Sequence, residues 1–351
     1  MANFAEKENV FLKVAKYLIP WKGDNSSEVI RKIIFLGAIV VLIITLTMIF
    51  VFKGRVSGEN KENEELANLY HGTGVTIDTE KLEQLEKEFP TVQEQFLPLL
   101  EINKDVIGWI TIGATDPNEK PFIDYVVMQG KDNDYYLTHN YKGENSISGA
   151  IFADCRSPIT ADKRPANIVL YGHNMQSGEI FGKLSRYFNY SYTHSDKTDI
   201  SYYKNHPTVT FSTLYDTSTY KIFAGMLVNT EDVAGEVFNY HRVHNFKNKS
   251  EFDEYCAQVL DRSTFITPDV DLQYGDELIT LSTCIYGYND KADPRWVVFA
   301  RKVRDGESES VDVDKAFANP SPLFYDMYYS TFGGKWNGRQ WPTDIIKGYK
   351  N

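Results

Sequence analysis

The chain has 351 residues, of which 42% are hydrophobic and 24% are charged. A chain of this length and apolar content can bury a large core, which excludes an intrinsically disordered protein. The 37 basic side chains are outnumbered by 48 acidic ones, so the net charge is −11 and nucleic acid is set aside as a partner. The three cysteines, Cys155, Cys256 and Cys284, are an odd number and too few for a disulfide-stapled scaffold.

The first predicted element is a membrane-spanning helix at residues 33–52. These twenty residues carry no charge, and as an α-helix they span about 30 Å, the thickness of the hydrocarbon core of a bilayer. The alternative is a buried core helix, but such a helix keeps a polar face, and here only Gly37, Thr45 and Thr47 interrupt the apolar run. A cleaved signal peptide is disfavoured because the run is too long and no small-residue cleavage site follows it.

The charges beside this helix predict its orientation. Residues 1–32, a predicted cytoplasmic tail, hold six basic and four acidic side chains, whereas the basic residues just after the span are mixed with several glutamates. Because basic flanks stay on the cytoplasmic side, we expect a single-pass protein of the cell membrane with its N-terminus inside. The part that follows residue 32 then faces the exterior and carries a net charge of about −13.

Residues 53–89 are predicted to form a membrane-proximal stalk that ends in a helix. The segment is rich in Glu and Lys, and apolar residues recur at helical spacing between Thr79 and Phe89. Pro90 breaks this helix, and a second apolar face continues over residues 92–100.

Beyond residue 105 the pattern changes to short strands. Apolar or alternating runs are separated by turns rich in Gly, Asn, Asp and Pro. Seven or eight such strands predict a closed barrel or a sandwich. The runs are Val106–Ile112, Phe122–Met128, Ala150–Ala153, Asn167–Tyr171, Thr208–Thr213, Tyr220–Val228, Glu277–Ser282 and Trp296–Val303.

One helix interrupts the strands, and an aromatic tail follows them. Ser250 with Asp253 three residues on approximates a capping box and predicts the start of this helix. Cys256 falls on its apolar stripe and is predicted to be a core residue, and Cys155 is interpreted as a core or loop thiol. Residues 304–351 form an aromatic-rich C-terminal extension, which we expect to pack against the domain because so many aromatic side chains are not left in water.

Three residues at the ends of strands carry the predicted chemistry. Cys284 ends an apolar strand, where a rigid scaffold presents a nucleophile to solvent, although an ordinary core thiol is an equal alternative at this position taken alone. A thiolate needs a base or a cation, and His173 also follows an apolar strand, unlike the other six histidines, which fall in polar loops or the stalk. Arg295 begins the strand after Cys284, so a tight hairpin would return it beside the thiol as a donor to an oxyanion. The alternative for this arginine is a surface pairing with Asp290 or Asp293.

These motifs resemble those of the sortases, and of class B sortases in particular. The runs TLSTC at 280–284 and YGHNM at 171–175, with Arg295 at the head of RWVVFARKV, are similar to the Cys, His and Arg motifs of that family. The resemblance covers about residues 90–303. Further runs similar to class B sequences lie at 102–110, 132–152, 180–187 and around 245–263.

The resemblance implies a sortase-type closed β-barrel of about eight strands, with N-terminal helices and a helix in the loop before the second-last strand. It also implies transpeptidation. Cys284 would attack a backbone carbonyl in the C-terminal sorting signal of an exported protein, His173 would act as acid and base, and Arg295 would position the signal and stabilise the oxyanion. Further candidates for oxyanion or substrate contacts are Ser282, Thr283 and the amide of Ile285.

The implied partners are the sorting-signal peptide of an exported surface protein and an amine acceptor. The acceptor is a peptidoglycan precursor or a pilin subunit, and signals in the family run from N-P-x-T-N to P-x-T-G types. The membrane is contacted through residues 33–52. No cofactor or metal is expected, since the chain has no H-E-x-x-H or C-x-x-C pattern.

Two other functions are kept as alternatives. A cell-wall-associated Cys-His peptidase is one, but papain-like families place the cysteine before the histidine, the reverse of the order of His173 and Cys284. The run Ser218–Lys221 matches the S-x-x-K of penicillin-binding enzymes but opens a strand and lacks the partner motifs. A tethered binding or sensor domain whose catalytic residues are inactive is the second alternative.

Overall fold

The computed structural model describes residues 13–73, 79–113, 119–190 and 196–349. The chain divides into two compact units, Met1–Lys61 and Glu62–Asn351.

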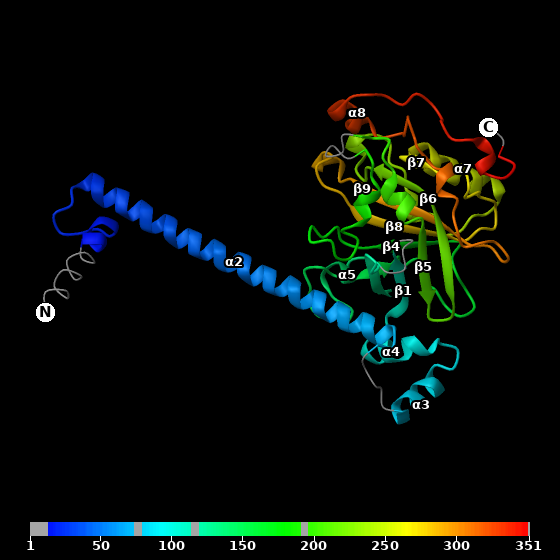
Figure 1. Cartoon of the computed structure of the whole chain (residues 1–351), viewed down its shortest axis with the longest axis horizontal. Coiled ribbons are helices and arrows are strands. Elements are labelled where there is room, and N and C mark those ends of the chain that lie inside the picture. Colours follow the sequence, from blue (N-terminus) through cyan, green and yellow to red (C-terminus); the bar gives the residue numbers. More distant parts are fainter. Residues whose placement is uncertain (1–12, 74–78, 114–118, 191–195, 350–351) are drawn as a thin grey trace. The chain divides into compact units, whose positions relative to one another are not determined.

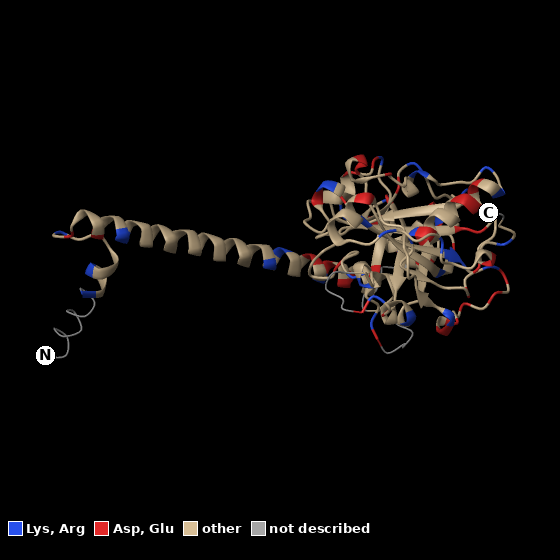
Figure 2. Ribbon diagram, turned by 90° about the horizontal axis from the view of Figure 1, so that it is seen from above, with Lys and Arg blue, Asp and Glu red and all other residues tan. Residues whose placement is uncertain are grey.

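The dominant element of the N-terminal unit is helix α2 (Ser26–Tyr70), which continues into the second unit. It is long and apolar enough to cross a membrane by length and composition, and the side chains of its apolar stretch are exposed. Figure 2 shows this uncharged stretch between basic residues. A helix at residues 33–52 is therefore confirmed, but it is longer than predicted. It extends through much of the segment predicted as a stalk and ends just before Gly72, whose positive φ of 69° is typical of a residue that follows a helix.

The second unit begins with short helices. Helix α3 (Thr79–Glu88) confirms the helix predicted before Pro90, and α4 (Leu97–Ile102) follows it. The apolar side of α4 is buried against the outside of the first two strands of a barrel, where Leu99 and Leu100 join Trp109 in one cluster. These helices lead the chain directly into the first strand.

The core of the second unit is a closed barrel of eight strands, as predicted (Figure 1). Its strand order is β1-β2-β3-β4-β8-β9-β6-β5. Neighbouring strands are antiparallel except for β2 with β3 and β4 with β8, which are parallel. The strands are β1 (Val106–Ile112), β2 (Ile123–Met128), β3 (Ile151–Ala153), β4 (Asn167–Tyr171), β5 (Thr208–Thr213), β6 (Thr217–Val228), β8 (Leu278–Cys284) and β9 (Arg295–Lys302). Short helices α5 (Tyr135–Thr138) and α6 (Ser201–Asn205) lie in the connections.

Helix α7 (Lys249–Arg262) lies in the long connection between β6 and β8, as expected. Its apolar stripe packs on the outer face of β6 and β9, and Cys256 is fully buried there, which confirms it as a core residue. The predicted start at Ser250 is wrong. Asn248 caps the helix by accepting a hydrogen bond from the Glu251 amide at 3.0 Å, and the Glu251 carboxylate accepts one from the amide of Lys247 at 2.8 Å. These two hydrogen bonds cap the helix at Asn248, two residues before the predicted capping residue Ser250.

The C-terminal extension packs back on the barrel domain, as expected. Strand β10 (Phe317–Ala318) pairs with β7 (Phe265–Ile266), and helix α8 (Asp326–Phe332) follows. Figure 1 shows the extension running from α8 over one end of the barrel toward α7. Near its end, Arg339 donates two hydrogen bonds of 2.8 Å to the buried carboxylate of Asp261 on α7.

An ion-pair cluster fixes the beginning of the extension. Glu307 accepts hydrogen bonds from Arg301, which is fully buried on β9, at 2.6 and 2.7 Å. Lys221 on β6, which is 4% exposed, donates a third at 2.8 Å. Glu307 is thus the shared counter-ion of two buried cations, so its removal would leave both without their closest partner.

Candidate active site

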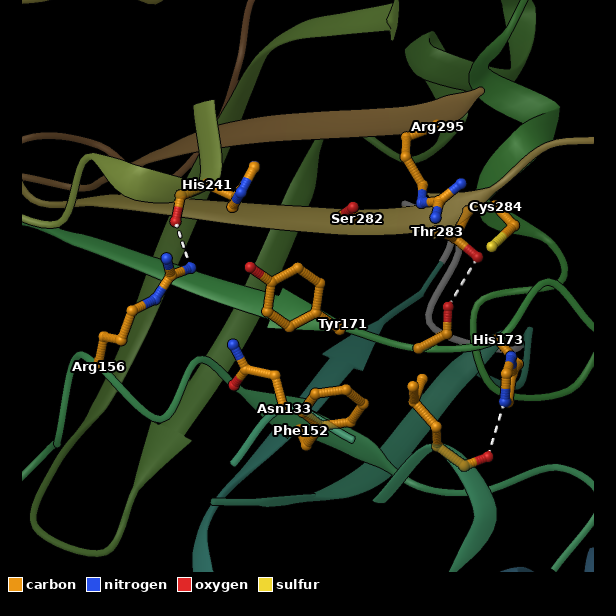
Figure 3. A pocket seen from close by; sticks show the side chains of 12 residues that line it. Asn133, Phe152, Arg156, Tyr171, His173, His241, Ser282, Thr283, Cys284 and Arg295 are labelled. Carbon is orange, nitrogen blue, oxygen red and sulfur yellow. Dashed lines mark hydrogen bonds between the residues drawn. The ribbon is translucent and has the colours of Figure 1, made fainter. Parts of the chain in front are cut away.

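The mixed strand directions of the barrel bring Cys284 and His173 to the same edge. Strands β4 and β8 are parallel, and Tyr171 pairs with Ser282 at their ends. His173 lies two residues after Tyr171, and Cys284 lies two residues after Ser282. Both side chains are partly exposed and line one pocket, where Figure 3 shows the thiol and the imidazole on adjoining segments.

Arg295 reaches the same place through the antiparallel pair of β8 and β9, in which Cys284 and Arg295 are direct partners. The guanidinium donates to both carboxylate oxygens of Asp293, at 2.7 and 2.8 Å, while it also lines the pocket. Arg295 therefore pairs with Asp293, the predicted alternative, and also lies beside the thiol of Cys284. The two arrangements do not exclude each other.

The electrostatics keep this arginine cationic. Burial would lower the pKa of Arg295, but the hydrogen bond to Asp293 and the nearby Cys284 outweigh it and raise the pKa above its usual value. In turn, the hydrogen bond from Arg295 lowers the pKa of Asp293. The thiol therefore has a guanidinium beside it that is itself paired with the carboxylate of Asp293.

A hydrogen bond orients the imidazole of His173. Its Nε2 lies 2.8 Å from the carbonyl oxygen of Leu137, which belongs to α5. Because a carbonyl can only accept, Nε2 carries a proton in this arrangement. In the neutral ring Nδ1 is then the atom that can take a proton from a thiol or an amine.

Two further hydrogen bonds tie the histidine segment to the cysteine strand. The Thr283 hydroxyl donates to the carbonyl of Gly172 at 2.7 Å, and the Gly172 amide donates to the carbonyl of Ser282 at 3.2 Å. A Cβ at position 172 would lie 2.8 Å from Ile180 and Phe181, so only glycine fits this close approach.

The three further candidates, Ser282, Thr283 and Ile285, all make hydrogen bonds within the protein. The Ser282 hydroxyl is buried and lies 2.7 Å from the hydroxyl of Tyr240, and the Thr283 hydroxyl is taken up by Gly172. The Ile285 amide, predicted to donate to an oxyanion, donates to the carbonyl of Pro294 at 3.2 Å in this structure. This hydrogen bond extends the pairing of β8 with β9 one residue past Cys284. A role of this amide toward an oxyanion stays a prediction.

The pocket has a volume of about 540 Å³ and extends well beyond the three predicted residues (Figure 3). Its lining is Asn133, Leu137, Phe152, Arg156, Tyr171, Gly172, His173, His241, Ser282, Thr283, Cys284 and Arg295.

Sequence reasoning missed several of these residues. Asn133 and Leu137 fall in the run at 132–152, which resembles class B sequences, so that resemblance was the only signal for them. Nothing marked Arg156, and His241 was assigned to a polar loop. Sequence patterns are local, whereas these side chains reach the pocket from separate loops.

The end of the pocket opposite Cys284 holds a second charged cluster. The carboxylate of Asp154 is fully buried, and it accepts hydrogen bonds from Arg156 and from the hydroxyl of Tyr171, both at 2.8 Å. Burial opposes ionisation, but these bonds hold the pKa of Asp154 well below its usual range. Burial, with help from Arg156, lowers the pKa of His241. Burial likewise lowers the pKa of His244, whose side chain is 12% exposed, against the opposing charge of Asp154.

Cys155 and Cys256 lie in surroundings that raise the pKa of a thiol. All three cysteines are free. Burial raises the pKa of Cys155, and nearby Asp154 raises it further. Burial raises the pKa of Cys256 well above its usual value. Neither environment favours a thiolate.

Within the described part of the chain, no group of three or more His, Cys, Asp or Glu side chains is placed to hold a metal ion.

Comparisons with known proteins point to one family. A family model described as the Sortase domain matches residues 121–303. The chain is 32% identical over 254 residues to sortase B of Listeria monocytogenes, covering 71% of this chain and 90% of that protein. It is 28% identical over 275 residues to sortase B of Staphylococcus aureus, covering 77% and 97%.

Solved structures give the same result. The crystal structure of sortase B from B. anthracis in complex with AAEK1 matches with a TM-score of 0.53 and 27% identity, over 71% of this chain and 98% of that one. The Staphylococcus aureus sortase B-substrate complex matches with a TM-score of 0.53 and 25% identity, over 71% and 98%. The chain therefore belongs to the sortase family of transpeptidases, and within it to class B.

Proposed function

We propose that the protein is a membrane-anchored extracellular cysteine transpeptidase. It cleaves a C-terminal sorting signal of exported proteins through a thioacyl-enzyme at Cys284 and transfers the acyl group to an amine of a cell-wall precursor or a pilin. The single observation that carries this proposal is the meeting of a thiol, an imidazole and a guanidinium from β8, β4 and β9 in one pocket.

In the first step, the sulfur of Cys284 attacks a backbone carbonyl of the signal while Nδ1 of His173 takes the thiol proton. The developing oxyanion is stabilised by the guanidinium of Arg295, and the pocket beside it holds the residues that precede the cleaved bond. The C–N bond then breaks, and His173 gives a proton to the departing amine. The products are a thioacyl-enzyme and the C-terminal fragment of the signal.

In the second step, an acceptor amine attacks the thioester. His173 takes a proton from that amine through Nδ1, a new C–N bond forms, and the C–S bond breaks to release Cys284. The hydrogen bond from Nε2 to Leu137 keeps the ring oriented through both steps. No metal or organic cofactor enters the scheme.

The proposed anchor is residues 33–52, with residues 1–32 in the cytoplasm and the remainder outside the cell. The supporting observations are the uncharged stretch of α2 and the excess of basic residues before it. We further propose that residues 53–89 connect the membrane to a catalytic domain at 90–303, which residues 304–351 extend.

A cell-wall Cys-His peptidase and an inactive tethered binding domain are the competing functions. The experiment uses the full-length chain in detergent micelles with fluorogenic peptides of the N-P-x-T-N and P-x-T-G types, with and without hydroxylamine as a surrogate amine. We expect cleavage that yields the hydroxamate product and that Cys284→Ala abolishes, whereas Cys155→Ala retains it.

Each competing function has its own outcome. Hydrolysis without transfer to hydroxylamine would favour a peptidase. Absence of cleavage with every peptide would favour the binding domain. Equal turnover by Cys284→Ala would remove Cys284 as the nucleophile.

A further inference from the structure

The loop that joins Cys284 to Arg295 has a strained backbone. Within residues 285–294, Asn289 and Asp293 have positive φ angles of 74° and 41°, in a region that side-chain-bearing residues seldom adopt. Such conformations persist only where the surrounding structure holds them. The contacts that hold this loop are therefore part of what places Arg295.

The loop's strained end is bonded directly to the guanidinium. Asp293 binds Arg295 through both carboxylate oxygens and also through its own carbonyl at 3.0 Å. On its other side, Asp293 accepts hydrogen bonds of 2.9 Å from the Thr230 hydroxyl, at its carbonyl and at its carboxylate. A change in the loop backbone at Asp293 would therefore move the guanidinium with it.

The C-terminal extension supplies the contacts in the middle of the loop. The hydroxyl of Tyr325 donates to the carbonyl of Tyr288 at 2.6 Å in a buried position. The ring of Tyr288 is 2% exposed and packs between Phe188 of the barrel domain and Tyr328 and Phe332 of α8. This extension lies outside residues 121–303, which the family model matches.

The extension is itself firmly anchored away from the loop. Asn319 bonds the backbone of Ser263 and Thr264 at 2.7 and 2.9 Å, and Arg339 binds the buried Asp261. Helix α8 is therefore held by the barrel domain and can act as a fixed support for the loop.

We propose that residues 304–351 are a positioning element of the active site: Tyr325 and Tyr328 hold Tyr288, and through it the loop that sets the guanidinium of Arg295 beside the thiol of Cys284. The proposal deepens the proposed function and depends on it for its meaning. Tyr325 is a positioning residue, since it acts on the chemistry only through the loop.

The first test needs no sorting signal. In the full-length Cys155→Ser chain in detergent, the alkylation rates of Cys284 by iodoacetate and by iodoacetamide are measured by mass spectrometry across pH. A cation held beside the thiol favours the anionic reagent, so the ratio of the two rates reports the position of the guanidinium. We expect Arg295→Gln to lower this ratio about fivefold or more, and Tyr325→Phe to lower it about two- to threefold.

Two controls separate positioning from general destabilisation. Tyr349→Phe removes a hydroxyl of the same extension that bonds Arg339, away from the loop, and should leave the ratio unchanged. Adding Tyr325→Phe to Arg295→Gln should lower the ratio no further, because the group being positioned is already absent. An unchanged ratio in Tyr325→Phe alone, or an equal loss in Tyr349→Phe, would overturn the proposal.

The second test uses the peptide that the wild-type chain cleaves best. Tyr325→Phe should reduce kcat about tenfold with little change in KM, since it alters the placement of a catalytic group and not the pocket that binds the signal. If the wild type cleaves no peptide, the proposed function fails, whereas the alkylation ratio still decides the positioning role. Unaltered kcat with an active wild type would refute the positioning role alone.

Discussion

Arg295→Lys separates the charge of this side chain from its geometry. The guanidinium donates two bonds to the carboxylate of Asp293 and also contacts the carbonyl oxygens of Asp293 and Pro294. A lysine ammonium keeps the positive charge but cannot reproduce the planar fork that grips both carboxylate oxygens while it faces the thiol. The fold should survive, because the pairing of Cys284 with position 295 is made by the backbone.

The magnitude follows from the loss of one aligned donor to the oxyanion. Such a donor contributes about 2.7–4 kcal/mol, or about 10²–10³ in kcat. The retained charge of lysine offsets part of this, so we expect kcat to fall about 100-fold with KM within about threefold. The assay is the steady-state cleavage of the best N-P-x-T-N or P-x-T-G peptide by the full-length chain in detergent, with thermal unfolding followed in parallel.

Arg242→Lys is the matched control, because Arg242 is an exposed arginine in the loop before α7. It should keep wild-type kcat. The Arg295→Lys variant should unfold within about 3 °C of the wild type, since the charge remains paired with Asp293. A kcat above half of the wild-type value would refute the role assigned to the guanidinium, and a large drop in Tm would show that the loss reflects folding instead.

Three further predictions concern stability and alignment. Glu307→Gln removes the counter-ion of two buried cations and should cost about 3–5 kcal/mol, seen as a Tm lower by about 6–15 °C at pH 7, whereas the exposed Glu309→Gln should change Tm little. Hydrogen bonds from its cationic partners hold the pKa of Glu307 well below its ordinary value of 4.5, so its contribution to stability is complete above about pH 4.5. The difference in Tm between variant and wild type should therefore shrink as the pH falls below about 4.5. A difference in Tm that does not depend on pH would contradict this prediction. Thr283→Val removes the bond to the Gly172 carbonyl and should lower kcat about tenfold while Tm falls only a few degrees; unchanged kcat would show that the bond does not align the site. Because burial lowers the pKa of His244 below its ordinary value of 6.5, the unfolded chain takes up its proton first, so stability is lost as the pH falls below about 6.5. His244→Asn should flatten that dependence in pH-resolved thermal melts, and an equally steep loss would refute it.

The barrel could be predicted because a local sequence pattern marks each of its strands. Asn167–Tyr171 and the run ending at Cys284 are continuous apolar stretches, as expected of buried strands, and the structure has strands at both. The meeting of His173 with Cys284 needed more than periodicity. It depends on a parallel pairing of β4 with β8, two strands that are far apart in the sequence.

What could not be predicted depends on contacts between distant segments. The hydrogen bond from the Ile285 amide to Pro294 depends on how far β8 stays paired with β9. Arg156 and His241 enter the pocket from loops whose course no local pattern specifies. The cap of α7 at Asn248 was not predicted for a smaller reason: two overlapping capping patterns lie two residues apart, and side-chain geometry decides between them.

The bond between Thr283 and Gly172 joins residues that are 111 positions apart in the chain. During synthesis, therefore, β4 emerges long before the strand that completes its edge, and more than a hundred residues must follow before thiol and imidazole can meet. The active site therefore cannot be complete until β8 and β9, the last two barrel strands in the chain, have been made. A nascent chain that stops short of β8 has the histidine but no nucleophile, so its reactivity begins only when the domain is nearly complete.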